Sequence, residues 1–144
     1  MRNLTEAERI LRSAVERAPD AVEAHFYMGV VLFEREEIEA AVPFFRKAVE
    51  LKPDYALAWY NLGHCLKRRG DRAEALAAFR AAVACKPQFA QAHTNLGELL
   101  ADEGRLDEAG EHLRRASRLA PQDTRARQLL ESVQKRTAIR EQQR

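Results

Sequence analysis

Cysteine is scarce in this sequence, and long hydrophobic runs are missing altogether. The 144-residue chain has two cysteines, Cys65 and Cys85, which cannot make a disulfide framework and suit a reducing compartment. No stretch approaches the roughly 20 apolar residues that a membrane-spanning helix needs. The N-terminal residues are charged throughout, so they do not resemble a signal peptide. We therefore expect a cytoplasmic protein that does not enter a membrane.

An excess of charge of one sign is also missing. The chain has 24 basic and 22 acidic residues, a net charge of +2, where a general nucleic-acid binder would carry a basic face. The sequence contains no phosphate-binding loop, H-E-x-x-H helix, Cys-x-x-Cys pair or nucleophile elbow. We therefore expect neither an enzyme active site nor a metal or cofactor, and no nucleic-acid partner.

Proline occurs at a fixed period. Because proline blocks the continuation of a helix, prolines at equal spacing mark equally spaced helix ends. Four of the five prolines follow one another at intervals of 34 residues. Glycine, alanine and large apolar residues repeat with the same period. These columns are Pro19, Pro53, Pro87 and Pro121; Gly29, Gly63 and Gly97; Ala7, Ala41, Ala75 and Ala109; Leu11, Phe45, Phe79 and Leu113; and Ala14, Ala48, Ala82 and Ala116.

Residues 59–87 resemble the tetratricopeptide repeat, with its W-x2-L-G-x2-Y, A-x3-F and P signature. The matching residues are Trp59, Leu62, Gly63, Leu66, Ala75, Phe79, Ala82 and Pro87. The resemblance implies an all-α fold, a right-handed superhelical solenoid of antiparallel helix pairs, A and B. It predicts one domain over residues 1–144. Its parts are a lone helix B at 4–18, full repeats at 22–55, 56–89 and 90–123, and a capping helix at 124–141.

Three positions predict local departures from this pattern. Thr5 and Glu8, near the start of the lone helix expected at 4–18, have the spacing of a capping box. Glu36 stands where the other full repeats have glycine, so we expect a different turn there. Pro43 lies inside a predicted helix B and removes one backbone hydrogen bond, so we expect that helix to start late or to bend.

The resemblance further implies that ligands contact the concave face, which the A helices line. The candidate peptide-binding residues are those of the A helices not committed to packing. They are Phe26, Tyr27, Tyr60, Asn61, His64, Lys67, Arg68, Gln91, Asn95 and Glu98. For Phe26 and Tyr60, packing between neighbouring A helices is an equally good interpretation. Trp59 and Phe79 are expected in the core, and His25 and His93 replace Trp59 in the flanking repeats.

Asn61 and Asn95 occupy the same place in adjacent repeats. A primary amide both donates and accepts, so it can bind a peptide backbone whatever its side chains. Neighbouring helices lie about 8–10 Å apart, close to three residues of extended chain at roughly 3.3 Å each. The N-L-G triplets resemble the asparagine ladder of O-linked N-acetylglucosamine transferases. The alternative is that asparagine is simply common at this place in the family.

His64, Lys67 and Arg68 form a basic cluster on successive turns of one helix. Three donors could converge on an acidic group of a ligand. The alternative, which we favour, is a solvated face on which Lys67 and Arg68 pair with Glu34 or Asp102.

The preferred function is a protein-interaction module that binds an extended peptide or a partner protein in the concave groove. One alternative is the substrate-selecting or targeting domain of a larger enzyme, such as a glycosyltransferase. Another is self-assembly, because the lone helix at 4–18 carries an apolar stripe that includes Ile10 and Val15. That stripe predicts a possible symmetric homodimer through the N-terminal helix.

Overall fold

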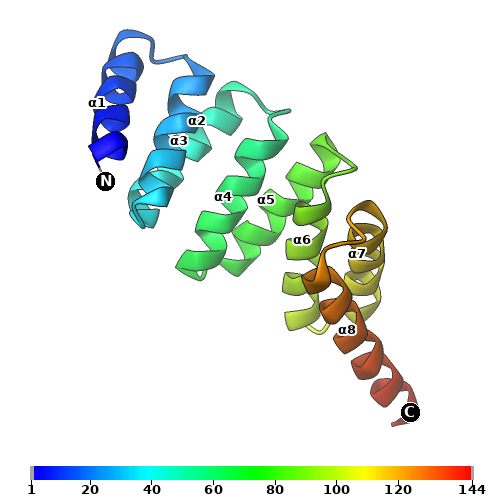
Figure 1. The fold of residues 1–144 in the computed structure, drawn as a ribbon. Coiled ribbons are helices and arrows are strands. Elements are labelled where there is room, and N and C mark those ends of the chain that lie inside the picture. The colour runs from blue at the N-terminus through cyan, green and yellow to red at the C-terminus, as the bar shows by residue number, and fades with distance from the viewer. Residues whose placement is uncertain (1, 144) are drawn as a thin grey trace. The chain divides into compact units, whose positions relative to one another are not determined.

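The computed structural model describes the backbone of residues 2–143 and the side chains of residues 5–143. Throughout this part of the chain the regular structure is α-helical (Figure 1). The helices are α1 (Arg2–Arg17), α2 (Val22–Glu34), α3 (Ile38–Leu51), α4 (Ala56–Arg69), α5 (Arg72–Cys85), α6 (Ala90–Asp102), α7 (Leu106–Leu119) and α8 (Thr124–Gln142). None of the described helices is long and apolar enough to cross a membrane.

The turn between the two helices of a repeat has one conformation in all three full repeats. Its central residue is left-handed, with φ of 64° at Glu36, 90° at Gly70 and 77° at Gly104. In each turn this residue's N–H donates to the carbonyl three residues back, and the next N–H donates to the carbonyl five residues back. The prediction of a different turn at Glu36 is therefore wrong. Glu36 adopts the conformation that glycine takes without steric cost.

The structure contradicts a capped start of α1 at Thr5 and a late start of α3, one of the two outcomes expected at Pro43. Helix α1 already includes Arg2, so Thr5 lies inside the helix and does not cap it. Helix α3 begins at Ile38, one repeat length before α5 begins at Arg72, so Pro43 does not delay its start. Pro43 is exposed, and the helix continues past it to Leu51. The ring of Pro43 therefore lies in solvent, where it displaces no packed side chain.

The repeating columns form the core. The alanines at 41, 75 and 109, the alanines at 48, 82 and 116, and the large residues Phe45, Phe79 and Leu113 are all 0% exposed. The equivalent residues of α1 (Ala7, Leu11 and Ala14) are only half-buried. The columns therefore repeat because each marks the same packing position in successive helix pairs.

The glycine column marks the closest approach of helices A and B. A Cβ built on Gly29 would lie 2.8 Å from the Phe45 ring. A Cβ on Gly97 would lie 2.6 Å from Leu113 Cγ and 3.2 Å from the Ala109 carbonyl oxygen. Cβ atoms do not approach neighbours this closely, so only glycine lets the two helices cross at this distance.

A ring N–H links each full repeat to the proline that precedes it. Trp59 Nε1 donates to the Pro53 carbonyl over 2.8 Å. His25 Nε2 lies 2.8 Å from the Pro19 carbonyl oxygen, and His93 Nε2 lies 3.0 Å from that of Pro87. A carbonyl oxygen only accepts, so both histidines must carry their proton on Nε2. Trp59, expected in the core, is half-buried because its indole faces this turn.

His93 makes a second hydrogen bond that the other two residues of this column do not show. Its Nδ1 lies 2.9 Å from Nδ1 of His112 on α7, and the two rings stack with centroids 5.2 Å apart. Since Nε2 of His93 donates to Pro87, Nδ1 of His93 must accept from the Nδ1–H of His112. One of the two rings must be neutral to accept this hydrogen bond, which joins α6 to α7.

The chain divides into two compact units. Unit 1 comprises residues 1–78 and unit 2 comprises residues 79–144. Within unit 1, α2 packs on α1, α3 and α4; within unit 2, α6 packs on α7 and α8 (Figure 1). Each unit therefore has its own packed helices.

Candidate functional site

The A helices of unit 1, α2 and α4, carry a surface of aromatic and polar side chains. We call this surface the A-face of unit 1 and define it by Tyr27, Phe33, Tyr60, Asn61 and His64. Tyr27 is 53% exposed, and the other four are partly exposed. An exposed tyrosine presents a large, rigid contact area with a polar hydroxyl, which is typical of protein-binding surfaces.

Phe26 lies beneath this surface and not on it. It is 4% exposed, and its ring centroid lies 4.8 Å from that of Tyr55 and 5.9 Å from that of Phe45. Of the two interpretations left open, packing is therefore correct for Phe26. Its ring also contacts Tyr27 edge-on at 5.2 Å, so it supports the exposed tyrosine from below. Burial raises the pKa of Tyr55, which keeps that hydroxyl protonated.

Tyr60 and His64 form a small network with Phe33. The Tyr60 hydroxyl and His64 Nε2 share a 3.1 Å hydrogen bond, and their ring centroids are 4.8 Å apart. Phe33 of α2 meets the His64 ring edge-on at 6.4 Å. These contacts hold His64 against aromatic rings of both A helices, so the face is ordered before any ligand arrives.

Arg68 is held by two partners. Its guanidinium lies 5.6 Å from the centroid of the Phe33 ring and is ion-paired with Glu36. The hydrogen bond from Arg68 lowers the pKa of Glu36. The predicted partners, Glu34 and Asp102, are wrong for Arg68, because the left-handed turn brings Glu36 toward α4 instead. An acidic ligand would have to compete with Glu36 for this guanidinium.

In unit 2 the predicted site residues lie in different surroundings. Asn95 is 1% exposed, and its amide donates to the Gln91 carbonyl one turn back over 2.9 Å. Glu98 is ion-paired with Arg125 of α8 at 2.7 Å. Gln91 is exposed. The prediction that Asn61 and Asn95 offer equivalent amides to a ligand is therefore wrong, because Asn95 is buried and engaged by its own helix.

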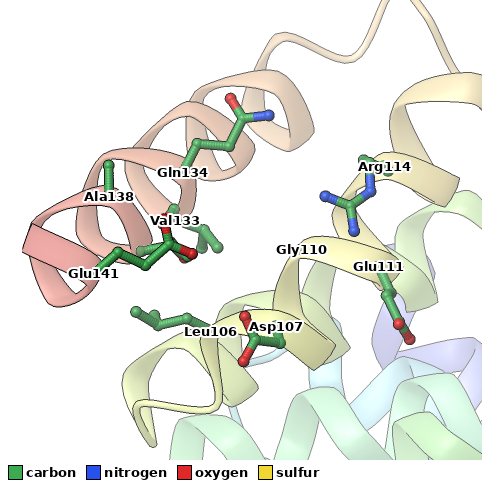
Figure 2. A pocket seen from close by; sticks show the side chains of 10 residues that line it. Leu106, Asp107, Gly110, Glu111, Arg114, Val133, Gln134, Ala138 and Glu141 are labelled. Carbon is green, nitrogen blue, oxygen red and sulfur yellow. The ribbon is translucent and has the colours of Figure 1, made fainter. Parts of the chain in front are cut away.

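A cavity of about 270 Å³ lies between α7 and α8 (Figure 2). We call it the α7–α8 cavity. Leu106, Gly110, Val133, Thr137 and Ala138 supply its less polar lining. Polar and charged side chains also line it: Asp107, Glu111, Arg114, Gln134 and Glu141.

Two departures from the repeat pattern explain this cavity. Gly110 stands where α3 has Val42 and α5 has Leu76, both of which are buried. Ala138 stands where the other A helices have the left-handed turn residue, so α8 runs on to Gln142 and forms the far wall. Both departures can be read from the 34-residue columns, where glycine replaces Val42 and Leu76 and alanine replaces the turn residue.

Chemically reactive groups do not gather among the described residues of either unit. Within the part of the chain that the structure describes, no three His, Cys, Asp or Glu side chains are placed to hold a metal ion. Burial raises the pKa of the Cys65 thiol to about 11, so this cysteine stays protonated and unreactive. What the A-face of unit 1 offers is hydrogen bonding and aromatic contact, which suit binding.

The comparisons with known proteins agree with this architecture. The family model for the tetratricopeptide repeat matches residues 1–56, 45–88 and 60–124. A solved structure of MamA has 23% sequence identity and a TM-score of 0.88, over 96% of this chain and 81% of that one. MamA from Desulfovibrio magneticus RS-1 has 27% identity and a TM-score of 0.83, over 94% and 76%.

A third similar structure is YrrB, described as a TPR protein with an unusual peptide-binding site. It has 28% identity and a TM-score of 0.76, over 87% of this chain and 64% of that chain. No curated protein matches the sequence. The family match, the 34-residue columns and the helix pairs agree: the chain belongs to the tetratricopeptide repeat family.

Proposed function

We propose that this chain is a protein-interaction module whose A-face of unit 1 binds an extended peptide. The observation that carries this proposal is the half-exposed Tyr27 on α2, supported from below by Phe26. Tyr60 and Asn61 are partly exposed on α4, which packs on α2. A preordered aromatic surface loses little side-chain freedom on binding, so its contacts contribute most of their energy to affinity. The similar structure of YrrB, a TPR protein with an unusual peptide-binding site, supports the same class of ligand.

Asn61 supplies the polar part of the proposed site. Its amide can donate to and accept from a peptide backbone, and Lys67, six residues further along α4, favours a carboxylate of the ligand. Because Arg68 already pairs with Glu36, we assign the ligand's main contacts to the tyrosines and Asn61. The ligand is thus a peptide with an apolar or aromatic side chain at Tyr27 and a backbone segment at Asn61.

The test uses peptides selected from a random display library against the full chain. For a selected peptide we expect Tyr27→Ala to weaken binding roughly tenfold and Asn61→Ala somewhat less, since one hydrogen bond contributes about 0.5–1.5 kcal/mol. The control is Glu50→Ala, which removes an exposed side chain of α3. If Tyr27→Ala and Glu50→Ala bind the peptides as tightly as the wild type, the site lies elsewhere.

Two alternatives from the sequence remain predictions. The targeting domain of a larger enzyme is supported by the N-L-G triplets at 61–63 and 95–97, and the burial of Asn95 weighs against their use as a ladder. A symmetric homodimer through α1 is supported by Ile10, which is 56% exposed. Concentration-dependent mass measurements would test the second, because a symmetric contact stops at the dimer.

A further inference from the structure

The α7–α8 cavity combines an apolar interior with an acidic rim. Inside it, Leu106 is 6% and Val133 is 3% exposed. At the rim, Asp107 pairs with Arg140 at 2.9 Å, whereas Glu111 and Glu141 form no ion pair within the described residues. Arg114 also lines the cavity and offsets part of this charge. A fitting occupant is an aliphatic side chain flanked by basic residues.

Helix α1 presents such a side chain. Ile10 is 56% exposed, the most exposed of the large hydrophobic side chains in the described part of the chain. It lines a shallow hollow together with Arg9, Ser13 and Arg17. Arg9 pairs with Glu6 on the same helix at 2.6 Å, in an exposed pair that contributes little and is easily exchanged.

From these two surfaces we propose that copies of the chain associate head to tail. Ile10 of one copy enters the α7–α8 cavity of the next, in the space that Gly110 leaves where Val42 and Leu76 stand in the other repeats. Arg9 and Arg17 of the first copy face Glu111 and Glu141 of the second. The complementary charges set the direction of the contact, and the aliphatic side chain supplies its buried area.

Charge favours this asymmetric contact over the symmetric one. In a symmetric α1–α1 contact the hollow lined by Arg9 and Arg17 would meet its own copy, which places like charges together. In the head-to-tail contact the same arginines meet carboxylates. A heterologous contact leaves one α1 and one cavity unused at the ends of each assembly, so copies continue to add as concentration rises unless a ring closes. One side chain in one cavity is a small interface, so the association is weak.

Analytical ultracentrifugation of the full chain from about 10 to 500 µM tests the proposal. The weight-average mass of the wild type should rise with concentration and fall back when salt is added. Ile10→Glu and Gly110→Leu should each remain monomeric, the first lacking the inserted side chain and the second lacking the cavity. The matched control Ile139→Glu alters a side chain of α8 that is 54% exposed and does not line the cavity. It should associate like the wild type.

A mixture of the two blocked variants gives the decisive result. The Gly110→Leu copy keeps Ile10, and the Ile10→Glu copy keeps its cavity, so an equimolar mixture should form dimers and nothing larger. If Gly110→Leu lowers the melting temperature, Glu111→Lys with Glu141→Lys replaces it, since these two changes leave the packing intact. A monomeric wild type, blocked association with Ile139→Glu, or a mixture that stays monomeric would each overturn the head-to-tail contact. Peptide binding by Ile10→Glu should match the wild type, so failure here leaves the proposed function intact.

Discussion

At the residue scale, Glu36 shows how the fold imposes a backbone conformation on an unsuited side chain. The turn geometry is the same as at Gly70 and Gly104, so the packing of α2 against α3 determines it and the residue type does not. A Cβ is unfavourable at positive φ, and the ion pair with Arg68 is exposed, so it offsets only part of this cost. The strain is local and should be removable.

We therefore expect Glu36→Gly to melt at a higher temperature than Glu36→Ala. Both changes remove the carboxylate and its ion pair, and only the first relieves the left-handed strain. Glycine also makes the unfolded chain more flexible, which reduces the stability gained by relieving the strain. We therefore expect the melting temperatures of the two variants to differ by roughly 2–4 °C. Thermal unfolding followed by circular dichroism measures it. Equal melting temperatures would mean that the turn is unstrained at Glu36.

The His93–His112 pair makes stability depend on pH. Burial lowers the pKa of both rings, and at His112 the neighbouring His93 lowers it further. Arg115 near His93 and Arg80 near His112 act in the same direction, whereas Glu108 and Glu111 oppose it at His112. The two rings therefore bind protons more weakly in the folded state than in the unfolded chain. Their contribution to the free energy of unfolding is fully present above the ordinary histidine pKa of about 6.5, and it is lost as the pH falls below that value.

The expected result is a urea midpoint that decreases between pH 7.5 and pH 5.5. Protonation of both rings would place two N–H groups against each other and break the bond between His93 and His112. His112→Gln, which cannot titrate, should show a smaller decrease over the same range. If the wild type and His112→Gln lose stability in parallel, the pair has no part in the pH dependence.

At the scale of helices, replacing glycine by alanine should have opposite effects on stability at Gly97 and at Gly110. Gly97→Ala puts a Cβ 2.6 Å from Leu113 and 3.2 Å from a backbone oxygen. Such overpacking costs about 1–3 kcal/mol. A Cβ on Gly110 meets only Arg114, at 3.4 Å, so Gly110→Ala should gain helix propensity worth about 1 kcal/mol. Denaturant unfolding of both variants measures the difference; a stabilised Gly97→Ala variant would refute the close crossing of α6 and α7.

The bounds of most helices could be predicted from the sequence because proline and glycine act locally. Helices α2, α4, α6 and α8 start at residues 22, 56, 90 and 124, where the 34-residue period places them. Sequence-based predictions of turns and helix starts are wrong where tertiary packing overrides a local preference. Glu36 adopts the repeat turn, and α3 starts at the repeat position despite Pro43, because in both places the neighbouring helix imposes the repeat geometry. Thr5 was read as a cap because capping-box spacing also occurs inside helices.

At the scale of the whole molecule, the site could be predicted only by region. The family resemblance pointed to the A helices, and the structure places Tyr27, Tyr60, Asn61 and His64 on the surface of unit 1. Periodicity could not separate Phe26 from Tyr27, or Asn61 from Asn95, because both members of each pair lie on an A helix. Their burial depends on neighbouring side chains such as Tyr55, which lies outside the helices at the end of the preceding turn.

Nuclear magnetic resonance of the full chain titrated with a display-selected peptide tests the central claim most directly. The account predicts that shifts in the ¹H–¹⁵N spectrum cluster on α2 and α4, at Tyr27, Tyr60 and His64, and include the side-chain amide of Asn61. The amides of α7 around Gly110 should not move, since the α7–α8 cavity serves a different contact. Peptide-induced shifts confined to helices other than α2 and α4 would contradict the assignment of the binding site to the A-face of unit 1.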